Sequence, residues 1–111
     1  MKLYLDTSDQ NRCVLMLDDQ TYEWEAKKEL AEKLLKFIND KLAENGKTWQ
    51  DLTEITFFSG PGSFTGLRIG AAIVNTLATE LQIPLYNQNG EKLQIVIPDY
   101  GRAPNIGTPR K

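Results

Sequence analysis

The stretch GPGSFTGLRIG, residues 60–70, constrains the fold of this chain more than any other part of the sequence. It combines glycines, a proline, two hydroxyl side chains and an arginine, and it runs directly into an apolar segment. Before it, EITFF (54–58) is a compact apolar run typical of a buried strand. After it, residues 65–81 repeat apolar residues at helical spacing. The sequence therefore predicts a strand, a tight glycine-rich turn and a helix, in that order.

Two interpretations of this turn follow from its residues. Backbone N–H groups at the start of a helix, when they follow a glycine-rich turn, can hold an anion such as phosphate. However, no lysine completes a Walker A motif, and the spacing G-x-G-x-x-x-G is one residue longer than the dinucleotide-binding fingerprint. In the second interpretation the glycines and Pro61 only shape the turn, and Ser63 or Thr65 caps the helix.

The predicted helix at 65–81 is apolar around most of its circumference. Leu67 and Val74 mark one stripe, and Ile69 and Ile73 mark a second. Such a helix is either sunk in a large core or shared with a second protein, and a domain of 111 residues has no core that large. Glycines and alanines along the helix would let another helix approach closely. The composition of this helix therefore indicates a partner.

The first half of the chain predicts a sheet followed by another helix. Three short runs, KLYLD (2–6), RCVLMLD (12–18) and TYEWEA (21–26), predict an antiparallel meander joined by polar turns. KKELAEKLLKFINDKLAENG (27–46) predicts an amphipathic helix, with Gly46 just past its end. The apolar stripe of this helix is broad, which indicates either a wide contact with the sheet or a second contact with a partner.

The residue content excludes several kinds of chemistry. The chain has no histidine, so it cannot build a Ser-His-Asp or Cys-His nucleophile or an imidazole zinc site, and we predict no catalytic residue, metal or cofactor. Cys13 is the only cysteine, so an internal disulfide cannot form. The net charge of −2 argues against binding nucleic acid by bulk electrostatics. Since no signal peptide or membrane-spanning run is seen, we expect a cytoplasmic protein without membrane contact.

Together, these features resemble those of one protein family. DTS at 6–8, the strand hairpin, the leucine-rich helix and GPGSFTGLRIG before a small-residue helix are similar to the TsaB (YeaZ) family of bacterial tRNA threonylcarbamoyladenosine (t6A) biosynthesis proteins. The resemblance ends near IPLYN (83–87), which would close the sheet. It implies a single N-terminal lobe of the actin-like ATPase (ASKHA, RNase H-like) fold. This lobe is α/β, with a mixed five-stranded sheet, two main helices and an extended C-terminal tail.

The resemblance also implies a function. Members of this family are non-catalytic paralogues of TsaD, the subunit that transfers threonylcarbamoyl to adenosine 37 of tRNA, and they act as scaffolds. Their two helices pack against the equivalent helices of TsaD, or of a second copy in a homodimer, and a TsaE ATPase joins the assembly. Contact with tRNA is expected to be indirect or through the tail. The residues expected at the partner interface are Leu30, Leu34, Phe37, Ile38, Gly66, Ile69, Gly70, Ile73, Val74 and Leu77.

The glycine-rich stretch also matches a feature of the family. It corresponds to the turn that shapes and caps the second interface helix in the family, and any nucleotide contact there is secondary. The residues of this family turn are Gly60, Pro61, Gly62, Ser63, Phe64, Thr65 and Arg68.

The sequence departs from the family pattern in three respects. The usual His-Ser-Glu at the start of the first helix reads Lys27-Lys28-Glu29 here. Family members carry a second lobe of comparable size, whereas here IPDYGRAP (97–104), similar to a segment near the end of full-length members, follows the first lobe closely. The chain therefore resembles a first lobe joined to the family's tail. Finally, the metal ligands and catalytic loops of TsaD have no counterpart.

We accordingly expect two units, a TsaB-like lobe at 1–97 and a basic, Pro/Gly-rich tail at 98–111, in which Tyr100 and Arg102 are candidates for partner binding. Two interpretations of the tail remain, a solvated end and a segment that orders on its partner or touches tRNA. A second function also remains open, a small nucleotide- or phosphate-binding domain that uses the glycine-rich loop and Asp6.

Overall fold

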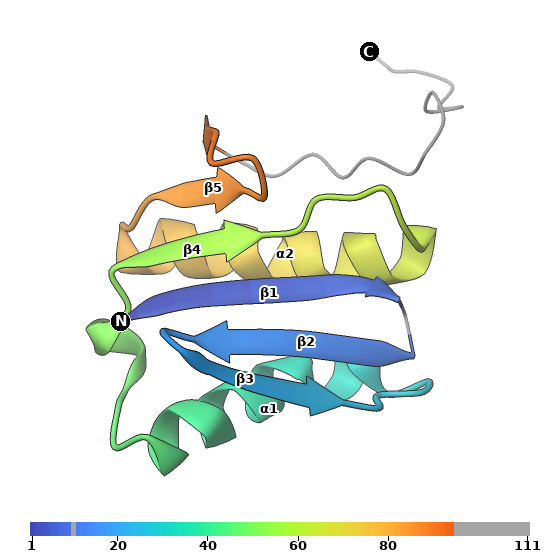
Figure 1. Cartoon of the computed structure of the whole chain (residues 1–111), viewed down its shortest axis with the longest axis horizontal. Coiled ribbons are helices and arrows are strands. Elements are labelled where there is room, and N and C mark those ends of the chain that lie inside the picture. The colour runs from blue at the N-terminus through green and yellow to red at the C-terminus, as the bar shows by residue number, and fades with distance from the viewer. Residues whose placement is uncertain (10, 95–111) are drawn as a thin grey trace.

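The computed structural model describes residues 1–9 and 11–94. Both helices lie on one face of a sheet, which gives two layers (Figure 1). This arrangement confirms the expected α/β class. The elements, in chain order, are β1 (Lys2–Asp9), β2 (Arg12–Leu17), β3 (Gln20–Trp24), α1 (Leu30–Glu44), a short 3₁₀ helix (Trp49–Asp51), β4 (Glu54–Phe57), α2 (Phe64–Leu81), β5 (Leu85–Asn87) and β6 (Lys92–Leu93).

The sheet is mixed, and its strand order is β3-β2-β1-β4-β5-β6. The short turns after β1, β2 and β5 make antiparallel pairs, whereas β1 pairs with β4, and β4 with β5, in parallel. A parallel pair needs a long crossover, and here the two helices supply it. As a result, the C-terminal ends of the parallel strands β1, β4 and β5 all lie at the same end of the sheet. The glycine-rich turn begins there, after β4.

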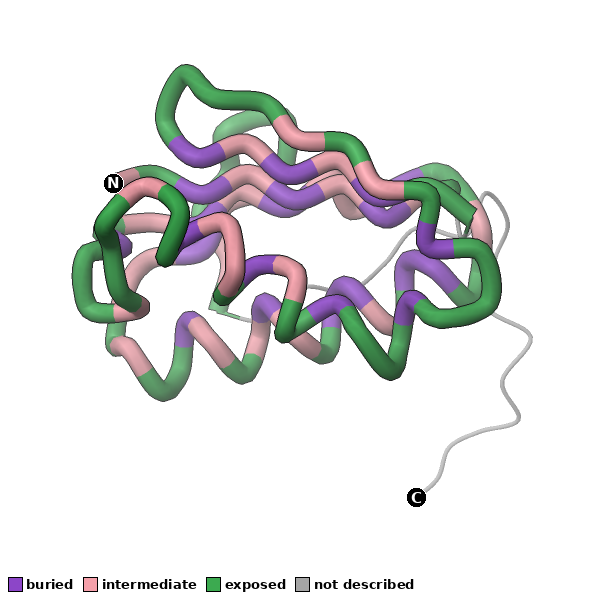
Figure 2. The backbone as a smooth tube through the Cα atoms, turned by 90° about the horizontal axis from the view of Figure 1, so that it is seen from below, coloured by how far each residue is buried: buried purple, intermediate pink, exposed green. Residues whose placement is uncertain are grey.

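The core fills the space between the sheet and the two helices. Along the strands, buried residues alternate with partly exposed ones, and the buried residues of the helices lie toward the sheet (Figure 2). Leu5, Leu15 and Phe57 are fully buried on the helix side of the sheet. Leu34 of α1 and Leu67 of α2 meet them from the second layer. Period-two alternation in the strands and four-residue spacing in the helices therefore place the apolar residues on facing surfaces.

The helix ends follow from particular residues. The Ser63 hydroxyl caps α2 by accepting a hydrogen bond from the Gly66 N–H at 3.2 Å, which confirms one of the two predicted caps. Gly46 follows α1 with a φ of +69°, the left-handed conformation predicted for it. The first helix begins later than the predicted 27–46, because Lys27 has a φ of +52° and lies outside helical geometry.

The described residues form six strands rather than the expected five, because the turn after β5 returns the chain as the short antiparallel strand β6. The tail at 98–111, with Tyr100 and Arg102, lies outside the described residues, as does its boundary at residue 97. Within the described ranges, neither helix has the length and apolar character needed to span a bilayer.

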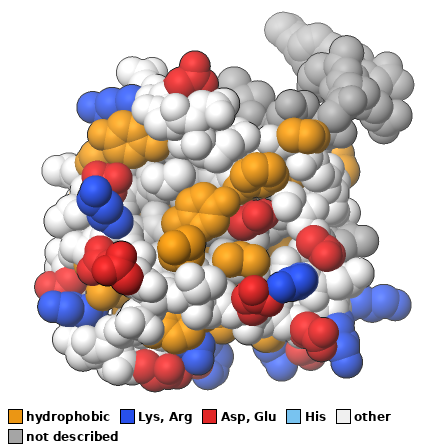
Figure 3. All heavy atoms as spheres, viewed as in Figure 1, with side chains coloured by type: hydrophobic (Ala, Val, Ile, Leu, Met, Phe, Trp, Pro, Cys, Tyr) orange, Lys and Arg blue, Asp and Glu red, His pale blue; other side chains and the backbone are white. Residues whose placement is uncertain are grey.

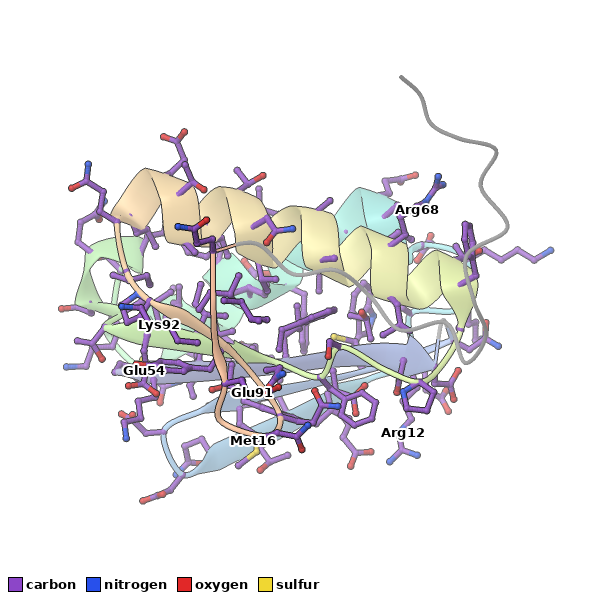
Figure 4. All side chains as sticks on the ribbon, turned by 90° about the horizontal axis from the view of Figure 1, so that it is seen from above. Arg12, Met16, Glu54, Arg68, Glu91 and Lys92 are labelled. Atoms are coloured by element: carbon purple, nitrogen blue, oxygen red, sulfur yellow. The ribbon has the colours of Figure 1, made fainter. Side chains whose placement is uncertain are left out.

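The face of the sheet away from the helices has an apolar centre. Tyr4, Met16 and Tyr86 are partly exposed there, because they alternate with residues that point into the core. Figure 3 shows hydrophobic side chains gathered across this face, with acidic and basic side chains around them. In Figure 4, Met16 lies on the side of the sheet opposite the helices.

Candidate partner-binding surface and glycine-rich turn

The glycine-rich turn packs on the end of β1, so the structure brings together the two segments that carry the family resemblance. The buried hydroxyl Oγ1 of Thr7 donates a hydrogen bond to the Gly66 carbonyl at 2.7 Å. The Ser63 N–H donates to the Ser8 carbonyl at 2.7 Å. A Cβ on Gly62 would lie only 2.6 Å from the Ser8 Cβ, so this position requires glycine. These contacts hold the start of α2 against the sheet.

Polar groups around this turn also bond to one another. The Asp6 carboxylate accepts hydrogen bonds from the Ser8 N–H at 2.8 Å and from the Ser8 hydroxyl at 2.6 Å. The side-chain oxygen of Gln88 accepts from the Ser59 N–H at 3.0 Å, while its nitrogen donates to the Gly60 carbonyl at 2.9 Å. These groups therefore stabilise the turn itself, in agreement with the interpretation in which its residues shape and cap a helix.

Thr7 allows this anchor to be tested. Thr7→Val keeps the size of the side chain but removes the hydroxyl that donates to the Gly66 carbonyl, so we expect a loss of ~0.5 to 1.5 kcal/mol in the free energy of unfolding. Thr7→Ser keeps the hydroxyl and removes only a buried methyl group. Urea denaturation of the wild type and both variants measures the losses, and a Thr7→Val protein as stable as the wild type would show that the hydrogen bond contributes nothing.

Two glycines of α2 face the sheet, which corrects the expectation that they meet a partner. Gly66 and Gly70 are both buried. A Cβ on Gly70 would clash with the Thr7 hydroxyl and would lie 2.6 Å from a ring carbon of Phe57. Close approach is therefore used here, but between α2 and its own sheet.

Other residues expected at the partner interface also lie in the core. They are the positions at four-residue spacing on α1 and one position on α2, and none is more than 2% exposed. Their side chains pack against the sheet, so they are inaccessible to a partner in the folded chain. These residues are Leu30, Leu34, Ile38 and Val74.

Phe37 is partly exposed, but it lies toward β3 and not toward α2. Its ring stacks on Trp24 with 5.0 Å between the ring centroids and 26° between the planes. The Lys41 ammonium lies 5.8 Å from the same ring. Phe37 therefore covers the β3 side of α1, separate from the other exposed apolar residues of the helices.

The remaining expected residues form a continuous surface between the two helices. Ile69 lines a groove together with Ala31 of α1, and Ile73 and Leu77 follow Ile69 at four-residue spacing on α2. Leu35 follows Ala31 in the same way on α1 and is 49% exposed. We call Ala31, Leu35, Ile69, Ile73 and Leu77 the interhelix surface. Leu35 was not among the expected interface residues, although its position beside the buried stripe was a signal for it.

Phe64 and Arg68, at the start of α2, form a separate exposed pair. Phe64 is 54% exposed, and the Arg68 guanidinium lies 5.6 Å from the centre of its ring. Arg68 points away from the sheet (Figure 4). Pro61, Gly62 and Thr65 of the same turn are exposed, whereas Gly60 is buried.

The ionisable groups with perturbed pKa values among the described residues lie away from this surface, two in the sheet and one, Asp51, in the 3₁₀ helix, where the Thr48 N–H lowers the pKa of its carboxyl. Burial, with a smaller effect of the Asp6 charge, raises the pKa of the Cys13 thiol to about 12. The same two causes raise the pKa of Tyr4. Cys13 is therefore a protonated core residue at neutral pH. In residues 1–9 and 11–94, no three His, Cys, Asp or Glu side chains are grouped in a way that could hold a metal ion.

The family model and the curated relatives that match this chain are all proteins of tRNA threonylcarbamoyladenosine formation. Residues 24–95 match the family model described as TsaD, tRNA N6-adenosine threonylcarbamoyltransferase. The tRNA threonylcarbamoyladenosine biosynthesis protein TsaB of Bacillus subtilis is 33% identical over 87 residues, 75% of this chain and 38% of that protein. TsaB of Escherichia coli is 30% identical over 86 residues, 75% of this chain and 37% of that protein. The chain thus spans well under half the length of these relatives.

A solved structure shows the same likeness. YeaZ from Pseudomonas aeruginosa superposes with a TM-score of 0.67 at 33% sequence identity, over 78% of this chain and 42% of that one. Both comparisons therefore cover most of this chain, and each covers only part of its relative.

Proposed function

Since the chain belongs to the TsaB (YeaZ) family and has the actin-like ATPase fold of that family, we propose that it is a non-catalytic scaffold subunit of a t6A modification complex. In this proposal its main partner is a TsaD-like protein. A TsaE-like ATPase joins the assembly, and a homodimer forms when the TsaD-like protein is absent. Contact with tRNA is indirect or through the tail, and the complex works in the cytoplasm.

The interhelix surface is the observation that carries the proposal. Leu35 is half exposed, and Ile69, Ile73 and Leu77 are partly exposed although each packs against the core on one side. Apolar residues gathered on two neighbouring helices are typical of a surface that is covered in an assembly. A partner helix laid along α1 and α2 would remove these side chains from water.

The contacts of the glycine-rich turn support a scaffold over a nucleotide-binding domain. Asp6, the acidic residue of the alternative, is bonded to both the N–H and the hydroxyl of Ser8. At the start of α2, the Gly66 N–H is bonded to the Ser63 side chain. A phosphate bound by the Gly66 N–H would have to displace the Ser63 side chain, and no observation favours that exchange.

Reconstitution tests this proposal. With unmodified tRNA, ATP, threonine and bicarbonate, we expect t6A to form when this chain is added to the TsaD-like protein, the TsaE-like protein and the enzyme that makes the threonylcarbamoyl donor, all from the same organism. Omitting the chain should reduce t6A formation by at least tenfold. The chain in place of the TsaD-like protein should form none, and formation of t6A in that arm would show that the chain is catalytic.

A further inference from the structure

A groove with an aliphatic floor and a cationic rim lies between the first turns of α1 and α2. Its volume is about 520 Å³. Leu30 and Ala31 of α1 and Ile69 of α2 contribute the aliphatic part. Lys27 and Lys28 approach it from the segment before α1. Asn11 and Thr65 complete the lining, so no carboxylate and no aromatic ring lines this groove.

The two lysines differ from the lysines of the α1 helix itself. Lys33, Lys36 and Lys41 form ion pairs with Glu29, Asp40 and Glu44 at 3.3, 2.8 and 3.1 Å. Among the described residues, Lys27 and Lys28 form no ion pair of this kind. Glu29, the carboxylate next to them in sequence, is the one that pairs with Lys33.

The groove thus carries positive charge that the described part of the chain does not neutralise. The N-terminal end of α1 adds to it, because the helix dipole is positive there. The backbone at Lys27 is also held in place, since its N–H donates to the Asn11 carbonyl at 3.3 Å.

We propose that this groove binds a short acidic segment of a partner protein. An aliphatic side chain of the segment packs on Ala31 and Ile69, above the buried Leu30. A neighbouring Asp or Glu pairs with Lys27 and Lys28. Complementary charge supports an acidic occupant. The groove also runs into the interhelix surface at Ala31 and Ile69, so a segment bound here lies next to a partner helix on that surface.

A protein segment fits this groove better than a nucleotide. The lining offers no aromatic ring on which a base could stack. The ring of Phe64, next in sequence to the lining residue Thr65, already has the Arg68 guanidinium over it. The aliphatic floor instead provides a surface for a leucine or isoleucine side chain. The inference goes beyond the proposed function, because it requires an acidic segment and not a TsaD-like protein in particular.

A titration followed by NMR tests the groove in the full chain without any natural partner. The probe is a blocked ten-residue peptide of alternating Leu and Glu, and its control is the matching Leu and Lys peptide. We expect the acidic peptide to shift the amide signals of Asn11, Ala31 and Ile69, and the basic peptide to leave them unchanged. Lys27→Glu with Lys28→Glu should weaken binding of the acidic peptide at least tenfold.

Lys47→Glu is the matched control variant, because it reverses an exposed lysine beyond the far end of α1. It should change the affinity for the acidic peptide less than twofold. Three results would overturn the inference: no shifts with the acidic peptide, equal shifts with both peptides, or equal losses in the two variants. Larger shifts at the same residues with ATP than with the acidic peptide would assign the groove to a small anion and would also overturn it.

Discussion

Gly70→Leu should lower the melting temperature by more than ~10 °C, or prevent folding altogether. A Cβ at this position would clash with the Thr7 hydroxyl and would lie 2.6 and 2.9 Å from ring atoms of Phe57. Neither neighbour can move easily, since Phe57 is fully buried and the Thr7 hydroxyl is bonded to Gly66. Overpacking a core costs ~1 to 3 kcal/mol or more, and each kcal/mol shifts the melting temperature by ~4 to 8 °C in a domain of this size.

Helix propensity works in the opposite direction but is too small to compensate. Leucine is a better helix former than glycine by less than ~1 kcal/mol. Ala72→Leu is the matched control, because Ala72 is exposed on the same helix two residues later. Thermal unfolding followed by circular dichroism should separate the two variants clearly. A Gly70→Leu protein that melts with the wild type would show that α2 does not lie this close to Thr7 and Phe57.

The neighbour that packs on Gly70 could not be predicted from the sequence. Small residues along α2 predicted a close approach, and a close approach exists, but the expected neighbour was a partner helix. The sequence could not decide between the sheet and a partner, because α2 carries apolar residues on more than one face. Only the packing of the Thr7 hydroxyl and the Phe57 ring against Gly70 identifies the side that is buried.

On α1 the sequence was more informative about the fold than about the surface. The four-residue spacing of Leu30, Leu34 and Ile38 predicted a helix with one apolar stripe, and that stripe is the buried one. The width of the stripe did not reveal that its two sides differ. Phe37 lies on the β3 side and is stacked on Trp24, whereas Leu35 lies beside the groove. This difference between the two sides arises from contacts with elements that are distant in the sequence, which the pattern of α1 alone does not contain.

Local signals at turns and strands were more reliable. Short apolar and aromatic runs bounded by polar turns predicted β1 to β3 within a few residues, because strand residues and turn residues differ locally in type. Ser63 and Gly46 marked helix ends, since capping depends on the residue itself and its immediate neighbours. The sixth strand was not among the five expected; its two described residues, Lys92 and Leu93, pair with β5 at the edge of the sheet.

Leu35→Asp should weaken association with the TsaD-like protein of the same organism by about a hundredfold, which is ~2.7 kcal/mol. Covering the interhelix surface would bury the new carboxylate without a partner charge, and such burial is costly. Because Leu35 is 49% exposed in the free chain, the fold should tolerate the change. The variant should therefore unfold at nearly the wild-type temperature while its affinity falls.

Ala72→Asp is the control, because it adds the same carboxylate to an exposed helical position outside the interhelix surface. Isothermal titration calorimetry of the wild type and both variants against the TsaD-like protein is the most direct measurement of the central claim, that this chain is a scaffold which docks through α1 and α2. The account predicts wild-type binding, a loss of about a hundredfold for Leu35→Asp and a change of less than about threefold for Ala72→Asp. No binding by the wild type, or equal affinities for the wild type and a folded Leu35→Asp protein, would contradict it.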